Sequence, residues 1–472
     1  MSGPHQNYRL LIDGDLVTTA ATIDVINPAT GEAFAQAPDA GAAELDRAVA
    51  AATRAFPGWR DTPIAERKRA VLAAADTIEA HAEELALLFT LEMGRPHIGS
   101  QREFVRAVDW TRGMAQWDLP VEVTEENDAH RVEVHRVPLG VVAGLVPWNF
   151  PVVLGMFKLV PPLIAGNTVV IKPSPFTPLC TLRIAELIKD HFPAGVVNVL
   201  SGGDDLGPLI TAHPGFAKIT FTGSTETGRK IAAAAAGDLK RMTLELGGND
   251  AAIVLDDADV ESVAPRIFLG AYGNTGQICV ATKRLYVHDA IYDAFRDKLH
   301  ALIQAGKVGD GREEGVMFGP LQNKRQYDRV RALVDDARAE GLRVLEGAAV
   351  PERGYFVPLT LVDNPPEQSR VVQEEAFGPV LPMMRFSSDD EVVERANASS
   401  YGLGGSVWSG DTARAVGIAH RLETGCVWVN ENTGISHLTP QAGTKQSGLG
   451  VESGLVGLLE YTRPKAIWIA KA

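Results

Sequence analysis

The sequence predicts an α/β protein with two α/β domains. Segments with the short apolar pattern of strands alternate with segments of helical periodicity through most of the chain, and this alternation is typical of parallel sheets covered by helices. The length of 472 residues allows several domains with a cleft between them. Hydrophobic residues make up 45% of the chain and charged residues 22%, which is an ordinary globular balance.

The N-terminal part is predicted to be helical. Apolar residues at helical spacing predict a helix over 44–56 that ends at Pro57-Gly58. Thr62 and Pro63 have the pattern of an N-cap and a first-turn proline, and the apolar stripe that follows continues to a stop at 94–96. Residues 121–137 alternate around a polar turn, which predicts an antiparallel hairpin that projects as an arm.

Two sets of alternating elements follow the hairpin. The first set has expected strands at 141–146, 168–172, 196–200 and 219–221, and expected helices at 179–190 and 226–236. The second set has expected strands at 285–287, 380–386, 406–408 and 427–429, and expected helices at 291–304, 326–340 and 412–422. Residues 466–470 form a last strand, a natural candidate to pair with the hairpin or with a neighbouring subunit.

Composition excludes several classes of protein. The formal net charge of -14 gives no global electrostatic support for nucleic-acid binding. Three cysteines cannot form a disulfide framework, and they fit a reducing compartment. The start lacks the apolar stretch of a secretory signal, and no window approaches the ~18 apolar residues of a membrane span, so we expect a cytoplasmic protein. The eleven histidines show no HExxH or Cys/His cluster, so no metal is expected.

Three segments offer reactive side chains. Cys279 follows small and polar residues in NTGQICV, where a thiolate would be a strong nucleophile. Glu245 lies in LELGGN, and its apolar neighbours should raise its pKa toward that of a general base. Asn149 lies between two prolines in PWNFP, where its amide can donate to an oxyanion. Taken alone, each segment also allows a structural interpretation: an inert buried cysteine, a solvent-facing glutamate, or a turn held by the asparagine side chain.

A fourth segment has the form of a phosphate site. Residues 219–228 read ITFTGSTETG, a strand that leads through Gly223 and Ser224 into a helix N-terminus. Free backbone N–H groups and the helix dipole suit a phosphate there. The segment lacks the GxGxxG pattern, so on local evidence an ordinary helix N-cap is favoured.

The order and spacing of seven segments resemble the NAD(P)-dependent aldehyde dehydrogenase superfamily over nearly the whole chain. They read PWNFP, KPSPFTP, FTGSTETG, LELGGN, GQICVA, EEAFGPV and KQSGLGVESG. The resemblance implies an aldehyde dehydrogenase-like α/β fold with a Rossmann-like cofactor domain, an α/β catalytic domain and a small β oligomerisation arm. The expected boundaries are 1–119 and 139–247 for the cofactor domain, 248–446 for the catalytic domain, and 120–138 and 460–472 for the oligomerisation domain.

The resemblance implies oxidation of an aldehyde to a carboxylic acid. Cys279 corresponds to the nucleophile that forms a thiohemiacetal and then a thioester, and Glu245 to the base that activates water for hydrolysis. Asn149 and the backbone N–H of Cys279 correspond to the oxyanion hole. Glu452 and Lys158 correspond to residues of the proton path, although a surface glutamate and a snorkelling surface lysine remain open.

The implied cofactor is NAD, with NADP possible. The residues that correspond to cofactor contacts are Trp148, Lys172, Gly223, Ser224, Glu375 and Phe377. Pro175 stands where many NAD-preferring members have a glutamate that repels the 2′-phosphate of NADP, which puts the exclusion of NADP in doubt. Asp204 and Asp205 would lie near the adenosine end, where their negative charge would disfavour that phosphate.

The residues that correspond to the substrate tunnel are Phe150, Phe157, Ile278 and Gln441. Gln441 replaces a usual aromatic residue, which either allows a hydrogen bond to a polar aldehyde or widens the tunnel. Aliphatic, aromatic and polar aldehydes therefore all remain candidate substrates. The expected partners are a small-molecule aldehyde and further copies of the chain in a homodimer or homotetramer, with no nucleic acid and no membrane.

Two alternative functions are less well supported than the oxidation of an aldehyde to its acid. A CoA-acylating semialdehyde dehydrogenase would pass the thioester to CoA, but such members commonly lack the glutamate base that Glu245 matches. A non-catalytic cofactor-binding relative is disfavoured because both Cys279 and Glu245 are intact.

Overall fold

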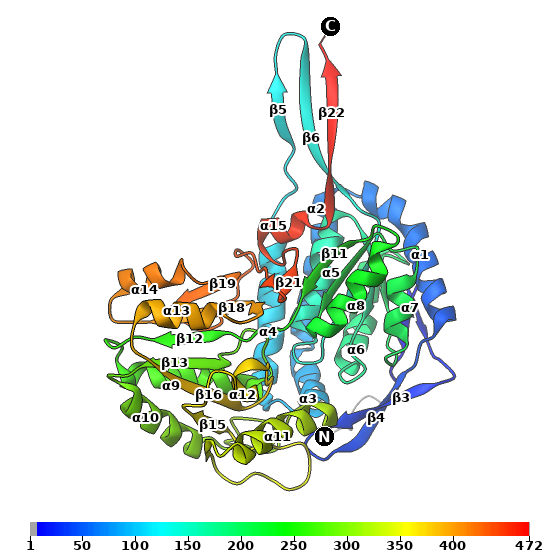
Figure 1. Ribbon diagram of the computed structural model, residues 1–472. Coiled ribbons are helices and arrows are strands. Elements are labelled where there is room, and N and C mark those ends of the chain that lie inside the picture. Colours follow the sequence, from blue (N-terminus) through cyan, green and yellow to red (C-terminus); the bar gives the residue numbers. More distant parts are fainter. Residues whose placement is uncertain (1–6, 472) are drawn as a thin grey trace.

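Two large sheets organise the computed structural model, which describes residues 7–471 (Figure 1). The first sheet has eight strands in the spatial order β2 (Asp15–Val17), β1 (Leu10–Ile12), β9 (Val197–Val199), β8 (Thr168–Lys172), β7 (Val141–Leu145), β10 (Lys218–Thr222), β11 (Arg241–Glu245) and β21 (Gly448–Leu449). The five strands from β9 to β11 are parallel, and the pairs at both edges are antiparallel. The chain runs outward from β7 in one direction through β8 and β9, and then in the other through β10 and β11. The direction therefore reverses between β7 and β10, and such a switch point is where open α/β sheets bind ligands.

Helices cover both faces of this sheet, and β7 and β8 are buried along their whole length. The helices of this half are α1 (Ala42–Asp61), α2 (Ile64–Ala80), α3 (Ala82–Met93), α4 (His97–Met114), α5 (Val153–Ala165), α6 (Leu179–Ile188), α7 (Leu206–Ala212) and α8 (Thr225–Ala236). Strands β3 (Thr22–Asn27) and β4 (Glu32–Pro38) form a separate pair.

Two sequence predictions for the N-terminal helices are wrong. The first helix does not end at Pro57-Gly58 but continues to Asp61. Trp59 is buried and its indole donates a hydrogen bond to the Leu163 carbonyl (3.1 Å), so tertiary packing holds the last turn helical. The stripe expected to be one helix is two, because the chain breaks at His81 between α2 and α3.

The second sheet has seven strands in the spatial order β14 (Arg343–Glu346), β15 (Thr360–Asp363), β16 (Val380–Phe386), β13 (Arg284–His288), β12 (Ala251–Val254), β18 (Gly404–Trp408) and β19 (Cys426–Val429). All pairs are parallel except β14 with β15. Successive residues of β12 belong to two different core clusters, which is the alternation expected of a strand buried on both faces. The helices here are α9 (Val260–Tyr272), α10 (Tyr292–Ala305), α11 (Lys324–Ala339), α12 (Arg370–Gln373), α13 (Asp389–Asn397) and α14 (Thr412–Ala419). Every strand and helix expected in the two alternating sets occurs, with ends that differ by a few residues.

A three-stranded arm projects from the body of the molecule (Figure 1). It contains β5 (Glu122–Glu126), β6 (His130–Pro138) and the C-terminal β22 (Thr462–Ala470). Strand β22 runs antiparallel to β6 from the pair Thr462↔Pro138 to the pair Ala470↔His130. The predicted hairpin and its pairing with the last strand are confirmed.

Short elements complete the C-terminal part: β17 (Tyr401–Gly402), which pairs with β20 (Thr444–Lys445), and α15 (Gly454–Leu459). Over residues 7–471, no helix is long and apolar enough to cross a membrane.

Candidate active site

Cys279 lies in a tight loop between α9 and β13. Asn274 and Thr275 in this loop adopt positive φ angles of 50° and 57°. A Cβ atom on Gly276 would lie 2.1 Å from the Gly378 carbonyl oxygen, so only glycine fits there. Cys279 is partly exposed, yet burial raises the pKa of its thiol to about 12, against the lowering influence of the Lys283 ammonium.

Asn149 is held against the cysteine loop from the other half of the molecule. Its side-chain amide donates to the Gln277 carbonyl, two residues before Cys279 (2.9 Å). Its own carbonyl accepts from the Arg95 guanidinium (2.9 Å) and from the Asn274 amide (3.4 Å). The amide group of Asn149 carries two protons, so one is left for a substrate oxygen.

Glu245 ends β11 and is buried. Its Oε1 atom has no hydrogen-bond partner within the part of the chain that the structure describes. Burial raises the pKa of this carboxyl well above its ordinary value, the Glu452 carboxylate raises it further, and the Lys158 ammonium lowers it. A carboxyl group in such surroundings is suited to proton transfer near neutral pH.

Lys158 and Glu452 form a fully buried ion pair. Lys158 lies on α5, and Glu452 also accepts a bond from the Thr220 hydroxyl at 3.4 Å. Gln441 pairs with Glu452 through two backbone hydrogen bonds of 2.7 and 2.8 Å. Neither member of the pair is a surface residue, so the surface interpretations left open by the sequence are wrong.

Glu375 and Phe377 lie on the other side of the cysteine loop. Glu375 accepts a hydrogen bond from the Gly248 backbone (3.1 Å), and its carboxylate is 3.3 Å from the Lys283 ammonium. The ring of Phe377 meets the ring of Trp148 edge to face, with centroids 5.4 Å apart. The structure thus links Glu375 to Gly248 and Lys283, and Phe377 to Trp148.

Lys172 and the Gly223-Ser224 turn lie at the carboxyl ends of β8 and β10, on either side of the switch point. Burial lowers the pKa of Lys172 to about 8, while Asp204 and Asp39 raise it. A Cβ atom on Gly223 would lie 2.3 Å from the Phe221 ring, so a side chain there would meet that ring. The Gly223 N–H donates to the Glu245 carbonyl (3.0 Å), and the Ser224 hydroxyl accepts from the Thr227 N–H (3.2 Å), so Ser224 is the N-cap of α8 that the local sequence favoured. A basic donor at the end of β8 and the positive end of the α8 dipole after β10 fit the ribose and phosphates of a dinucleotide.

The expected tunnel residues differ in their surroundings. Phe150 lies under the Arg95 guanidinium, 4.2 Å from the ring centroid. Phe157 is buried and stacks on Trp110 with centroids 4.0 Å apart. Ile278 is partly buried directly before the cysteine.

Sequence reasoning missed two basic residues of this region. Arg95 is buried in an ion pair with Glu103 (2.9 Å) and also donates to Asn274 (3.0 Å). Its signal was an arginine inside the Gly94-Arg95-Pro96 stop, which was interpreted only as a helix end. Lys283 is the other, and its signal was a charged residue four positions after the cysteine, directly before an apolar strand.

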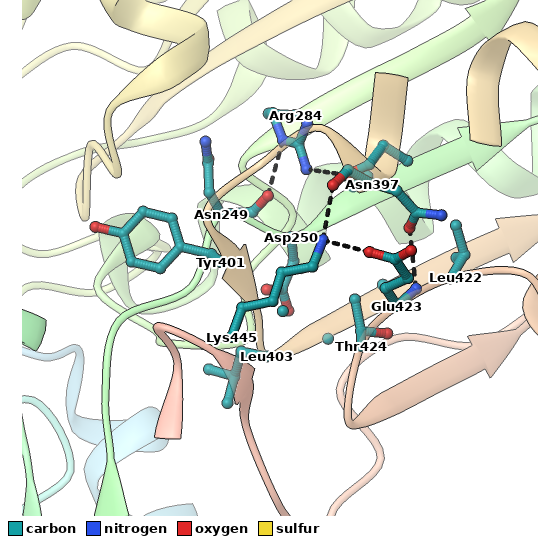
Figure 2. Close-up of a pocket in the computed structure, with 15 residues that line it drawn as sticks. Asn249, Asp250, Arg284, Asn397, Tyr401, Leu403, Leu422, Glu423, Thr424 and Lys445 are labelled. Atoms are coloured by element: carbon teal, nitrogen blue, oxygen red, sulfur yellow. Dashed lines mark hydrogen bonds and ion pairs between the residues drawn. The ribbon is translucent and has the colours of Figure 1, made fainter. Parts of the chain in front are cut away.

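A small pocket behind the cysteine loop lies at the ends of β12 and β18 (Figure 2). Arg284 lines one side of it and donates to the carbonyls of Asn249 and Ala396 (both 2.8 Å). Asp250 is buried beside it, and burial raises the pKa of its carboxyl to about 6 against the opposing charge of Lys283. The same pocket is closed by Lys445, which is paired with Glu423 (2.8 Å).

Comparison with known proteins gives consistent results. The profile of the aldehyde dehydrogenase family matches residues 16–467. A protein of a Pseudomonas species named "Probable aldehyde dehydrogenase" is 44% identical over 98% of this chain and 94% of its own length. The phenylacetaldehyde dehydrogenase of Pseudomonas fluorescens is 39% identical over 99% of this chain and 96% of its own. The solved NAD+ complex of aldehyde dehydrogenase from Bacillus cereus superposes with a TM-score of 0.96 at 36% identity, covering 99% of this chain and 97% of that one.

The fold and the matched family define an NAD-dependent oxidoreductase. The chain belongs to the aldehyde dehydrogenase family. The fold and the family that the sequence predicted are confirmed.

Proposed function

We propose that this protein oxidises an aldehyde to its carboxylic acid with NAD, through a covalent adduct on Cys279. Family membership supports the reaction class. The assignment of Cys279 as nucleophile and Glu245 as base rests on the buried Glu245 carboxyl. One oxygen of this carboxyl has no hydrogen-bond partner within the described residues, and its charge raises the pKa of Cys279.

The bond changes follow from the residues present. The sulfur of Cys279 bonds to the carbonyl carbon, and the oxygen takes up negative charge beside the Asn149 amide and the Cys279 backbone N–H. NAD, when bound, supplies the hydride acceptor. The C–H bond of the former aldehyde carbon would break as its hydride leaves with the electron pair to that acceptor, and the C=O bond would re-form as a thioester. Water then adds to the thioester carbon and gives a proton to Glu245, the carbon–sulfur bond breaks to release the acid, and the sulfur leaves as the Cys279 thiolate. The charges of Lys158 and Glu452 set the pKa of Glu245 during this proton transfer.

The proposed cofactor contacts follow from the correspondence of these residues with the family's motifs, and their places in the fold support them. Lys172 bonds the adenosine ribose, and Gly223 with Ser224 meets the pyrophosphate. The nicotinamide ribose binds at Glu375, near the aromatic pair of Phe377 and Trp148. NAD is preferred because Asp204 lies in the field of Lys172 and its charge disfavours a 2′-phosphate. NADP is used more weakly.

The assembly, the location and the domain boundaries belong to the same proposal. The arm supports a homodimer or homotetramer, since an exposed strand edge is stabilised by pairing across subunits. Three free cysteines support a cytoplasmic location. The proposed cofactor domain spans 1–119 and 139–247, the catalytic domain 248–446, and the oligomerisation domain 120–138 and 460–472.

The mechanism is tested with two variants. Cys279→Ala is expected to abolish NADH formation while NAD still binds. Glu245→Gln is expected to slow hydrolysis, so an acyl adduct on Cys279 accumulates and is seen by intact-mass measurement. Turnover by Cys279→Ala, or an unchanged steady-state rate without any adduct in Glu245→Gln, would refute these roles.

The substrate is tested with a panel of aliphatic, aromatic, amino- and semialdehydes, each with NAD and NADP and without CoA. The phenylacetaldehyde dehydrogenase relative makes an aromatic aldehyde a sensible first member. Turnover that requires CoA would move the protein to the acylating branch.

A further inference from the structure

Lys283 carries a buried positive charge beside the cysteine loop. Its side chain is 5% exposed, and its ammonium group donates to the carbonyl oxygen of Cys279. The same ammonium lies 3.3 Å from the Glu375 carboxylate and 5.9 Å from the centroid of the Phe377 ring. The proposed chemistry uses neither this charge nor its position.

The backbone fixes Lys283 where the loop enters β13. The backbone N–H groups of Lys283 and Arg284 both donate to the Asp250 carbonyl (3.0 Å each). The neighbouring N–H of Thr282 donates to the Gly270 carbonyl at the end of α9 (3.1 Å). These bonds fix the backbone of Lys283, while the Cys279 carbonyl and the Glu375 carboxylate hold its ammonium group.

A buried ammonium group is costly unless opposite charges surround it. Here two carboxylates face it, from Glu375 and from Asp250. These groups form a cluster, Lys283–Asp250–Glu375, which lies against the backbone of the nucleophile. The functional question is what this cluster does to the thiol.

The charged groups that act on the Cys279 thiol are Lys283, Asp250, Glu245 and Glu375. Three of them are carboxylates, and each of these disfavours a thiolate. Lys283 is the single cation in this set, and its ammonium group is bonded to the carbonyl oxygen of Cys279 itself. Without it, the thiolate would face burial and negative charge alone.

We infer that Lys283 is a positioning residue that favours the thiolate of Cys279, with Glu375 and Asp250 as its counter-charges. The inference deepens the proposed function, because it concerns the same nucleophile. It differs from a purely structural role, in which the lysine would only neutralise two buried carboxylates and leave the reactivity of the thiol unchanged.

The test measures alkylation of Cys279 by iodoacetamide in the absence of aldehyde and cofactor. The Cys279 peptide is quantified by mass spectrometry, so Cys180 and Cys426 do not contribute. Below the pKa of the thiol, the rate at a fixed pH is proportional to the thiolate fraction. Lys283→Met is expected to lower this rate about ten-fold, which corresponds to a rise of about one unit in the pKa of the thiol.

Two further variants control for charge and for folding. Lys283→Arg keeps the cation and is expected to restore most of the rate. Lys324→Met removes an exposed lysine that pairs with Asp328 (2.6 Å), and is expected to leave the rate unchanged. Equal rates in Lys283→Met and in the wild-type protein would overturn the inference.

Glu375→Gln/Lys283→Met gives a second test if Lys283→Met alone does not fold, because it removes the cation together with one counter-charge. Compared with Glu375→Gln alone, the double variant is expected to be alkylated about three-fold or more slowly, since only the lysine differs between them. Equal rates in these two variants would overturn the inference. None of these measurements needs aldehyde turnover, so a failure of the proposed function would appear separately, as a wild-type protein without dehydrogenase activity and with intact thiol titration.

Discussion

Two charged neighbours shift the pKa of Glu245 in opposite directions, so a change in either one should move that pKa. The Glu452 carboxylate raises the pKa of Glu245 and the Lys158 ammonium lowers it. Since Lys158 and Glu452 are paired with each other, a change in one alters the effect of both. A base with a raised pKa is active only where it has lost its proton, so hydrolysis is expected to speed up as pH rises through that pKa.

Glu452→Gln is expected to move this rise to lower pH. The substitution removes a negative charge that raises the pKa of Glu245, and it leaves the Lys158 ammonium without its partner, so both changes favour the carboxylate. The expected shift is about one pH unit, measured from single-turnover deacylation rates.

Glu460→Gln is the matched control. Glu460 pairs with Lys218 (3.3 Å) and is not among the groups that act on Glu245. A Glu452→Gln profile that is unchanged, or that moves to higher pH, would contradict the assigned coupling.

Asp204→Asn is expected to improve the use of NADP. One negative charge fewer near the Lys172 ammonium makes a 2′-phosphate less unfavourable by about 1 kcal/mol, so kcat/KM for NADP relative to NAD should rise about five-fold. The comparison is made at pH 7, below the pKa of about 8 of Lys172. Asp205→Asn, whose charge does not act on Lys172, should change the ratio little.

At the scale of elements, the turn between α3 and α4 connects the two halves of the site. Arg95 in this turn pairs with Glu103, bonds the carbonyl of Asn149 and bonds Asn274 in the cysteine loop. One side chain therefore fixes Asn149, the proposed oxyanion donor, relative to the loop of Cys279, the proposed nucleophile.

Arg95→Met is expected to lower the free energy of unfolding by about 3–5 kcal/mol, because it leaves the Glu103 carboxylate buried without its partner. It should also reduce kcat, since Asn149 loses its anchor. Denaturant unfolding and steady-state kinetics measure the two effects. Arg69→Met removes an exposed pair with Glu66 (3.5 Å) and should cost less than about 1 kcal/mol, so equal losses in the two variants would argue against this role.

Local patterns predicted most elements because strands and helices are encoded over short stretches. They failed where a distant contact decides the structure, as at α1, where Trp59 packs on Leu163 and carries the helix past Pro57. The site shows the same limit. Motif order identified Cys279 and Glu245, but the burial of Lys158 depends on a partner almost 300 positions away, at Glu452.

At the scale of the whole molecule, the arm determines the expected assembly. Its exposed apolar residues include Val123 on β5 and Trp468 and Ile469 on β22. Light scattering after size-exclusion chromatography is expected to give at least twice the chain mass of 50.5 kDa. Trp468→Glu should reduce that mass, whereas Leu239→Glu, at a position 89% exposed on the body, should not. A 50.5 kDa species for the wild-type protein would refute the oligomer.

The pairing of β22 with β6 also determines the order in which parts of the molecule can form during synthesis. The hairpin is synthesised before most of the two sheets and its partner strand β22 after them, so β6 waits with one edge unpaired through the synthesis of both sheets. Glu452 lies shortly before β22, ahead of α15, so Lys158 waits for its partner over nearly the same interval. A nascent chain therefore completes the ion pair beside Glu245 shortly before it completes the arm, and a chain cut before Glu452 would lack both.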